Sequence, residues 1–188
     1  MVGRPRSEQA RRAILEAALR LCERDGYPNV TLKGIAEEAG TGRQTLYRWW
    51  DTKADLLLEA MTYLVESSRA PSQADLQTFL RETFALADGA VGRVVAGLMA
   101  EAQSDPALGE RLRARLIGPR RATLRAVLER MPPPPGTDLD LLIDMIFGVM
   151  WYRLLNRHAP LDASLAEDIT TLVARIGASP GPDEERPG

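Results

Sequence analysis

Apolar residues recur three and four positions apart along nearly the whole chain, and no segment shows the alternation typical of a strand. This pattern predicts an all-helical fold of about nine helices. The expected helices span about residues 7–25, 31–39, 42–49, 53–67, 75–88, 91–103, 106–131 with a break at Gly118-Pro119, 138–156 and 165–176. Ser7 is a favourable N-cap for the first helix, and Gly26 is a favourable residue to end it.

The most informative stretch is residues 31–50, TLKGIAEEAGTGRQTLYRWW. Thr31 can cap a short helix whose apolar positions have helical spacing. Gly40 and Gly42 indicate a tight turn, because glycine adopts left-handed backbone conformations without strain. In the helix that follows, Leu46 and Trp49 point toward a core, while polar side chains share the opposite face: Arg43, Gln44, Tyr47 and Arg48. The stretch therefore predicts a helix-turn-helix with a recognition helix.

Individual residues in this stretch and its flanks also match a protein family. They are Thr31, Ile35, Ala36, Ala39, Gly40, Thr45, Leu46, Tyr47, Trp50, Lys53 and Leu56. At these positions the chain resembles the N-terminal DNA-binding module of the tetracycline-repressor (TetR) family of bacterial transcription regulators, over roughly residues 7–60. It departs from the family pattern at Gln44, where a small residue is common, and at Trp50, where phenylalanine is commoner. The first departure concerns DNA specificity, and the second concerns packing.

The resemblance implies how the chain is divided and what it does. Residues 1–52 would form the helix-turn-helix domain and residues 53–177 a helical domain for effector binding and dimerisation, entered through a long shared helix. Residues 178–188 are expected to be disordered. The implied function is that of a homodimeric, ligand-responsive regulator, most often a repressor, on a near-palindromic operator in double-stranded DNA.

Specific residues are candidates for DNA contact. Arg43 and Gln44 are the candidates for base edges, because arginine pairs with guanine and glutamine with adenine in the major groove. Thr31, Tyr47 and Lys53 match family positions that contact phosphates. Thr45 can join either group, and Arg48 shares the face of Arg43. Arg4 and Arg6 either enter a minor groove or belong to a disordered basic terminus.

The family's second domain usually binds a small molecule, so the resemblance implies an effector, of unknown identity here, and no cofactor. Large apolar residues of the second half are the candidate lining, although each is more often plain core. They are Phe79, Phe84, Met99, Met145, Phe147, Trp151 and Tyr152.

The helix at 138–156 is apolar nearly all round, which indicates burial on two sides, one against its own core and the other against a partner. One apolar set consists of Leu139, Leu142, Ile143, Ile146, Phe147, Met150 and Leu154, and the second set consists of Leu141, Met145, Val149, Tyr152 and Leu155. Together with the last helix, this helix is expected to form a four-helix bundle with a second copy of the chain. The predicted interface residues are Leu142, Ile146, Val149, Arg153, Leu165, Ile169, Leu172, Val173 and Ile176.

Composition narrows the class of protein. The chain has 45% hydrophobic and 27% charged residues, as soluble globular proteins do, and no apolar run of membrane-spanning length. Residues 1–53 carry a net charge of +3 on a chain of net charge −2, which fits a DNA-binding head on an acidic body. A single Cys and a single His exclude an internal disulfide and make a zinc site of these ligands improbable, and the composition as a whole favours a cytoplasmic protein without a membrane partner.

Other functions are weaker alternatives. The arginines between residues 111 and 125 are better explained as a solvated face paired with acids than as a second nucleic-acid site. An enzyme is not expected, because the sequence lacks a phosphate-binding loop, a nucleophile elbow and a metal-ligand cluster. The remaining alternative is a helical interaction or dimerisation module in which DNA binding is vestigial.

Overall fold

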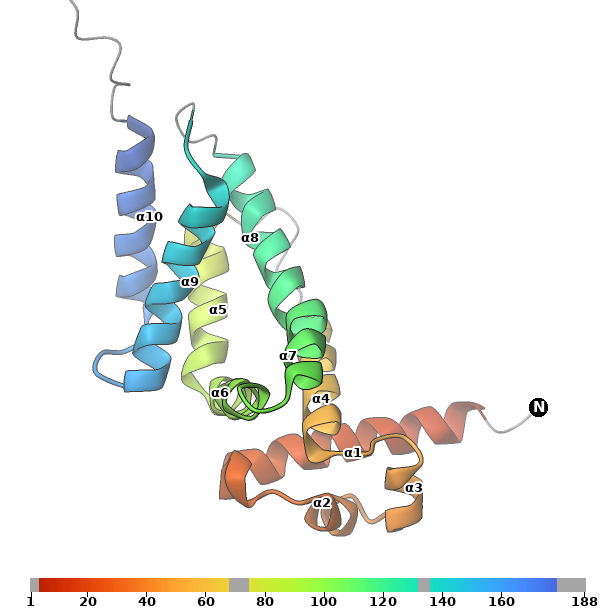
Figure 1. The fold of residues 1–188 in the computed structure, drawn as a ribbon. Coiled ribbons are helices and arrows are strands. Elements are labelled where there is room, and N and C mark those ends of the chain that lie inside the picture. Colours follow the sequence, from red (N-terminus) through yellow and green to blue (C-terminus); the bar gives the residue numbers. More distant parts are fainter. Residues whose placement is uncertain (1–3, 68–74, 132–135, 179–188) are drawn as a thin grey trace, which may run out of the picture. The chain divides into compact units, whose positions relative to one another are not determined.

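The computed structural model describes residues 4–67, 75–131 and 136–178. Over these residues the chain is helical and contains no strand, which confirms the all-helical class (Figure 1). The helices are α1 (Arg4–Asp25), α2 (Leu32–Glu38), α3 (Arg43–Tyr47), α4 (Lys53–Ser67), α5 (Leu76–Asp88), α6 (Ala90–Ala102), α7 (Pro106–Leu112), α8 (Gly118–Glu129), α9 (Leu139–Asn156) and α10 (Ala163–Ala178). A 3₁₀ turn, η1 (Tyr27–Asn29), follows α1, and a π-helical turn, η2 (Arg113–Ile117), joins α7 to α8 without a break. With α7, η2 and α8 counted as one continuous helix, the described residues contain nine helices, and the break expected at Gly118-Pro119 is absent.

The helices group into two compact units. The first comprises residues 1–69 and 89–118, and the second comprises residues 70–88 and 119–188. Helices α4, α6 and α7 therefore pack with the N-terminal helices, whereas the sequence-based division at residue 53 assigns them to the second domain. The physical reason is size, because a three-helix unit of about 50 residues buries too little apolar surface to be stable alone. Of the predicted tail, only Ala178, the last residue of α10, lies within the described residues.

Helix α1 begins earlier than its sequence predicts. It starts at Arg4, so Ser7 lies inside the helix and is not its N-cap. Proline suits a first helical turn, because its fixed φ is helical and its missing N–H would be unpaired there in any case. Arg4 and Arg6 therefore belong to a helical backbone segment and not to an extended arm. Their side chains lie outside the described part.

The core of the first unit follows the predicted stripe of α1. Its buried members are Ile14, Ala17, Ala18, Leu21 and Cys22. Helix α1 ends at Gly26, whose φ of +79° explains the glycine, since residues with a Cβ rarely adopt that conformation.

Cys22 should be almost inert in the folded protein. Its side chain is buried, and this burial raises the pKa of the thiol to about 11, against a smaller opposing effect of Lys53. At pH 8 roughly one thiol in a thousand would then be the reactive thiolate, compared with about a quarter for an unperturbed cysteine. Mass spectrometry after a short exposure to iodoacetamide should show an unmodified native protein and full labelling in urea. Rapid labelling without urea would contradict the buried position.

Tyr27 joins three segments of the first unit. Its ring is buried between η1 and α6, and its hydroxyl donates a hydrogen bond of 2.7 Å to Glu101 of α6. Burial, with this hydrogen bond, raises the pKa of Tyr27, so the phenol stays protonated as a donor. From α4, the Lys53 ammonium lies 4.6 Å from the ring centre and donates to the Tyr27 carbonyl oxygen at 3.2 Å. Gly97 of α6 lies against the ring: a Cβ there would be 2.3 Å from Tyr27 Cγ.

The core of the second unit comes from α5, α8, α9 and α10. Five residues predicted for the dimer interface are part of it: Leu142, Ile146, Leu165, Ile169 and Val173. Ile176 is partly buried against the same core, and the Arg153 guanidinium donates to the carbonyl oxygen of Pro160 at 2.8 Å. These five side chains pack within their own unit and leave little surface for a partner, and their place in a dimer interface stays a prediction.

Three of the six arginines between residues 111 and 125 form ion pairs with described acids, as expected of a solvated, paired face. In the first unit, Arg111 of α7 pairs with Asp55 of α4 at 3.0 Å. In the second unit, Arg121 and Arg125 of α8 form ion pairs with Asp140 of α9, and Arg121 also pairs with Asp144. Each surface ion pair of this kind contributes little to the free energy of unfolding, about 0–1 kcal/mol. Arg120 is different, as described below.

Candidate nucleic-acid interface

The turn between α2 and α3 depends on one capping residue and one glycine. The Thr31 hydroxyl accepts a hydrogen bond from the Gly34 amide at 3.1 Å, which confirms the predicted N-cap of α2. Gly40 has a φ of +62°, and the chain then folds back so that the Thr41 amide donates to the Ala36 carbonyl at 2.9 Å. Gly42 precedes α3 with a φ of −73°, which any residue can adopt. Only Gly40 therefore requires the conformational freedom of glycine.

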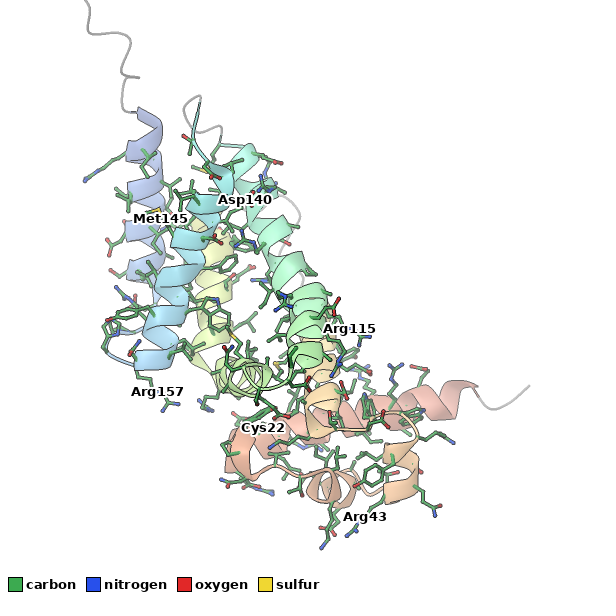
Figure 2. The ribbon with its side chains drawn as sticks, viewed as in Figure 1. Cys22, Arg43, Arg115, Asp140, Met145 and Arg157 are labelled. Atoms are coloured by element: carbon green, nitrogen blue, oxygen red, sulfur yellow. The ribbon has the colours of Figure 1, made fainter. Side chains whose placement is uncertain are left out.

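Helix α3 separates a polar face from a buried anchor. Leu46 is fully buried, whereas Arg43, Gln44, Tyr47 and Arg48 are all exposed. Tyr47 is 53% exposed, which excludes a role as a packing aromatic within its own chain. Arg43 lies on the side of α2 and α3 that faces away from α1 (Figure 2). The structure thus brings four of the predicted DNA-contacting residues together on one accessible face.

The residues that follow α3 brace it against the rest of the unit. Trp50 is buried, and its indole nitrogen donates to Glu59 of α4 at 3.0 Å. The second carboxylate oxygen of Glu59 accepts from Arg11 of α1 at 2.8 Å. Trp49, expected to face the core, is only half-buried and lies under the Arg48 guanidinium, 5.0 Å from its ring centre. Trp50 anchors the end of α3 in place of Trp49.

The remaining predicted contacts flank this face. Thr31 is exposed at the start of α2, and Thr45 is half-buried on α3. Lys53 is half-buried in the first turn of α4, where its ammonium makes the contacts with Tyr27 given above. Arg4 and Arg6 have no described side chains.

Charge on the first unit is distributed unevenly. On α1 and α2, Arg20 and Arg24 both pair with Glu38, and Lys33 pairs with Glu37. By contrast, neither Arg43 nor Arg48 forms an ion pair with any described side chain. The polar face of α3 therefore presents two uncompensated cations beside an amide and a phenol. Such a set can bind phosphates and hydrogen-bond to base edges.

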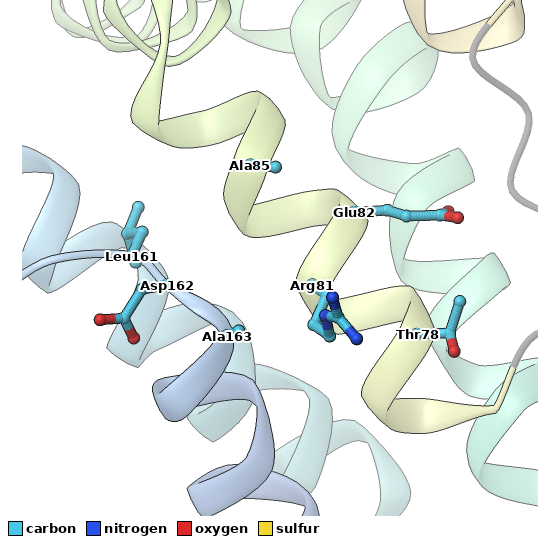
Figure 3. A pocket seen from close by; sticks show the side chains of 7 residues that line it. All are labelled: Thr78, Arg81, Glu82, Ala85, Leu161, Asp162 and Ala163. Atoms are coloured by element: carbon cyan, nitrogen blue, oxygen red, sulfur yellow. The ribbon is translucent and has the colours of Figure 1, made fainter.

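The second unit carries a surface groove of about 500 Å³ (Figure 3). Its lining comes from α5 and from the segment that leads into α10: Thr78, Arg81, Glu82, Ala85, Leu161, Asp162 and Ala163. None of the predicted pocket residues lines this groove. Phe79 and Phe84 are core residues, Phe147 and Trp151 pack partly buried against the core, and Met99 belongs to the first unit. The sequence therefore did not indicate the lining residues.

Helix α9 has a continuous apolar stripe that its own unit does not cover. The stripe consists of Leu141, Met145, Val149, Tyr152 and Leu155, which are 58%, 54%, 38%, 63% and 58% exposed. Leu172 of α10 is 55% exposed as well. Only Val149 and Leu172 were among the predicted interface residues. Apolar positions repeated over four turns of one helix are typical of a surface that packs against another helix.

Comparisons with known proteins agree with this geometry. Residues 14–60 match the family model "Bacterial regulatory proteins, tetR family", and residues 71–173 match "Tetracyclin repressor-like, C-terminal domain". An uncharacterized HTH-type transcriptional regulator of Bacillus subtilis, YdeS, is 31% identical over 176 residues, 89% of each chain. The DNA-binding transcriptional repressor TetR of Mycobacteroides abscessus is 27% identical over 192 residues, covering 95% of this chain and 100% of that protein. The crystal structure of the TetR family transcription regulator SCO0332 matches with a TM-score of 0.70 and 28% identity, covering 92% of this chain and 100% of that one.

Proposed function

The chain belongs to the TetR family of bacterial transcriptional regulators, which are not enzymes, and from this membership we propose that it is a homodimeric, ligand-responsive repressor. It would bind a near-palindromic operator as a dimer and leave it when a small molecule binds the second unit. A regulator of this kind works in the cytoplasm, where the DNA is. Among the described residues, no single helix is both long and apolar enough to cross a bilayer.

The observation that carries the proposal is the exposed face of α3 with its uncompensated arginines. Arg43 and Gln44 lie at the start of the helix, where recognition helices meet base edges. Tyr47 and Arg48 lie one turn further on and are assigned to the phosphate backbone on either side of the groove. The anchors Leu46 and Trp50 are buried, so this face is held in one orientation and little entropy is lost on binding.

Thr31 and Lys53 are assigned to the flanking phosphates. The Thr31 hydroxyl accepts one hydrogen bond from the backbone, and its proton can be donated to a phosphate oxygen. Lys53 has three N–H donors, of which one is directed to the Tyr27 carbonyl oxygen. These contacts would fix the register of α3 on the duplex without contributing sequence information.

Dimerisation is assigned to the exposed stripe of α9, with Leu172 of α10. One recognition helix reads only a few base pairs, whereas two helices placed about one turn of DNA apart, ~34–36 Å, read a two-fold symmetric site. Two copies of α9 and α10 would form a four-helix bundle around the stripe. The stripe is the second apolar set of α9, of which the predicted interface residues included only Val149.

The second unit is assigned to the effector. Its groove beside α5 is one candidate entrance, and the large side chains of its interior supply the apolar surface that small-molecule sites need. A ligand that prefers one arrangement of the dimer would change operator affinity by linkage.

The test is selection of duplexes from a random DNA pool at near-physiological salt. The double variant Arg43→Ala/Tyr47→Ala is compared with wild type and with Arg93→Ala, a control that removes one exposed arginine from α6. Wild type and the control should enrich one two-fold symmetric site, and the double variant should bind that site at least about 100-fold more weakly.

Other outcomes of the selection argue against the proposal. Equal, unstructured recovery by all three proteins would indicate binding driven by charge alone. Recovery of no duplex, with and without small-molecule extracts, would instead favour an interaction module that uses the α9 stripe.

A further inference from the structure

Arg120 differs from the other described arginines of α8. Arg121 and Arg125 turn toward the aspartates of α9, whereas Arg120 turns inward toward α5. Its guanidinium lies 5.0 Å from the ring centre of Phe79 and donates a hydrogen bond to the Thr83 hydroxyl. Phe79 and Thr83 are both buried, 1% and 7% exposed. A cation is therefore held against the interior of the second unit.

Two contacts fix the orientation of this guanidinium. The Thr83 hydroxyl donates to the Phe79 carbonyl at 2.7 Å, which leaves its oxygen lone pairs to accept from Arg120. The Phe79 ring supports the flat side of the guanidinium by a cation–π contact. A guanidinium has five N–H donors in one plane, and a single hydrogen bond uses one of them. The others remain able to pair with a planar acceptor.

No described carboxylate lies within ion-pair distance of Arg120. Burial lowers the pKa of Arg120, and the negative charge of Glu82, an exposed residue of α5, opposes this effect from a distance. Arginine remains charged at neutral pH in spite of such a shift. Arg120 is half-buried, and a partly desolvated cation without a counterion costs free energy; such costs concentrate at functional sites.

We propose that Arg120 is the anchor for the carboxylate of a monoanionic effector. The carboxylate would form a bidentate pair with the guanidinium. This inference rests on the proposed ligand-responsive function and names the chemical class of its ligand.

Charge balance selects a carboxylate over a phosphate. A single guanidinium neutralises one negative charge, and the carboxylate group matches the planar fork of arginine with two parallel hydrogen bonds. A phosphate monoester carries nearly two charges at neutral pH, and Glu82 adds repulsion in place of a second cation. The ligand class is therefore organic monocarboxylates.

The direct test uses full-length protein without DNA, labelled with ¹⁵N-arginine and observed by NMR at constant ionic strength. The probes are benzoate and hexanoate, each paired with its neutral amide and compared with added chloride. The Arg120 Nε resonance, assigned by its loss in Arg120→Gln, should shift with at least one carboxylate and not with its amide or with chloride. Arg120→Gln should weaken binding of that probe roughly 10- to 100-fold. Arg125→Gln removes the same charge from the same helix and should leave the affinity unchanged.

A shift of equal size with the amide or with chloride, or no shift with either carboxylate at millimolar concentration, would overturn the assignment. A purely structural arginine is distinguished by the melting temperature of ligand-free protein. Arg120→Met removes a desolvated charge and keeps an apolar side chain, so an anchor residue predicts an unchanged or higher melting temperature. A clear decrease would show that Arg120 serves packing instead.

The proposed regulatory function and the proposed carboxylate site at Arg120 can be contradicted independently. Carboxylate binding is measured without DNA, and operator binding is measured without carboxylate. Carboxylate binding at Arg120 in a protein that selects no duplex would remove the proposed regulator and keep the site. Operator binding with no response of Arg120 to either carboxylate would keep the proposed regulator and remove the carboxylate site.

Discussion

Replacing Gly97 by alanine is expected to destabilise the folded protein by about 2–3 kcal/mol, although alanine is the better helix former. A Cβ at position 97 would lie 2.3 Å from Cγ, 2.5 Å from Cδ1 and 2.8 Å from Cβ of Tyr27. The ring cannot easily retreat, because its hydroxyl is bonded to Glu101 and Lys53 lies over its face. Helix α6 must therefore move away from η1, which opens the packing between them.

Urea unfolding at fixed protein concentration measures this effect. Gly109→Ala is the control, since Gly109 is likewise a helical glycine of the first unit and is itself buried. A Cβ there would meet only Arg113 Nη1 at 3.4 Å and atoms of Ala102 beyond that distance, so its stability should change by less than about 1 kcal/mol. In the background of Tyr27→Ala, Gly97→Ala should lose most of its cost, because the clash requires the ring. Equal effects in both backgrounds would contradict the contact.

The sequence predicted features that depend on neighbouring residues along the chain. Thr31 caps α2, and Gly40 provides the left-handed turn. Both features can be predicted from a few neighbouring residues, because capping and turn formation depend on local chemistry. The polar face of α3 follows from helical geometry alone. The same local rules place the start of α1 at Ser7, whereas the helix begins at Arg4 because Pro5 suits a first helical turn.

Features that depend on tertiary neighbours could not be predicted. Periodicity showed that α9 has two apolar faces, but not that Ile146 faces its own unit while Met145 faces outward. In the sequence, Arg120 looks like the other arginines of its segment. Only its contact with α5 in the folded protein distinguishes it from Arg121, which forms an ion pair with α9. The contact of Tyr27 with Gly97 joins residues far apart in sequence, and neither residue type indicates the other.

The two faces of α9 lead to the second large effect. Replacing Met145 and Leu155 by glutamate should convert the proposed dimer to a folded monomer and weaken operator binding on the order of 1,000-fold or more. Four negative charges in a symmetric apolar interface would lose their hydration without partners, which costs several kcal/mol. A monomer retains one recognition helix and about half of the phosphate contacts, so its affinity approaches that of non-specific binding and its salt dependence falls by about half.

Sedimentation and fluorescence anisotropy on the selected operator measure the two effects. The control Ala122→Glu/Ala126→Glu places the same charge on exposed positions of α8 and should leave both the dimer and the affinity intact. Ile146→Glu provides the opposite comparison: Ile146 is 3% exposed in the core of its own unit, so this variant should unfold and not merely dissociate. A folded, dimeric Met145→Glu/Leu155→Glu protein would place the interface elsewhere. An Ile146→Glu protein that stays folded but becomes monomeric would show that the buried face, and not the exposed stripe, meets the partner.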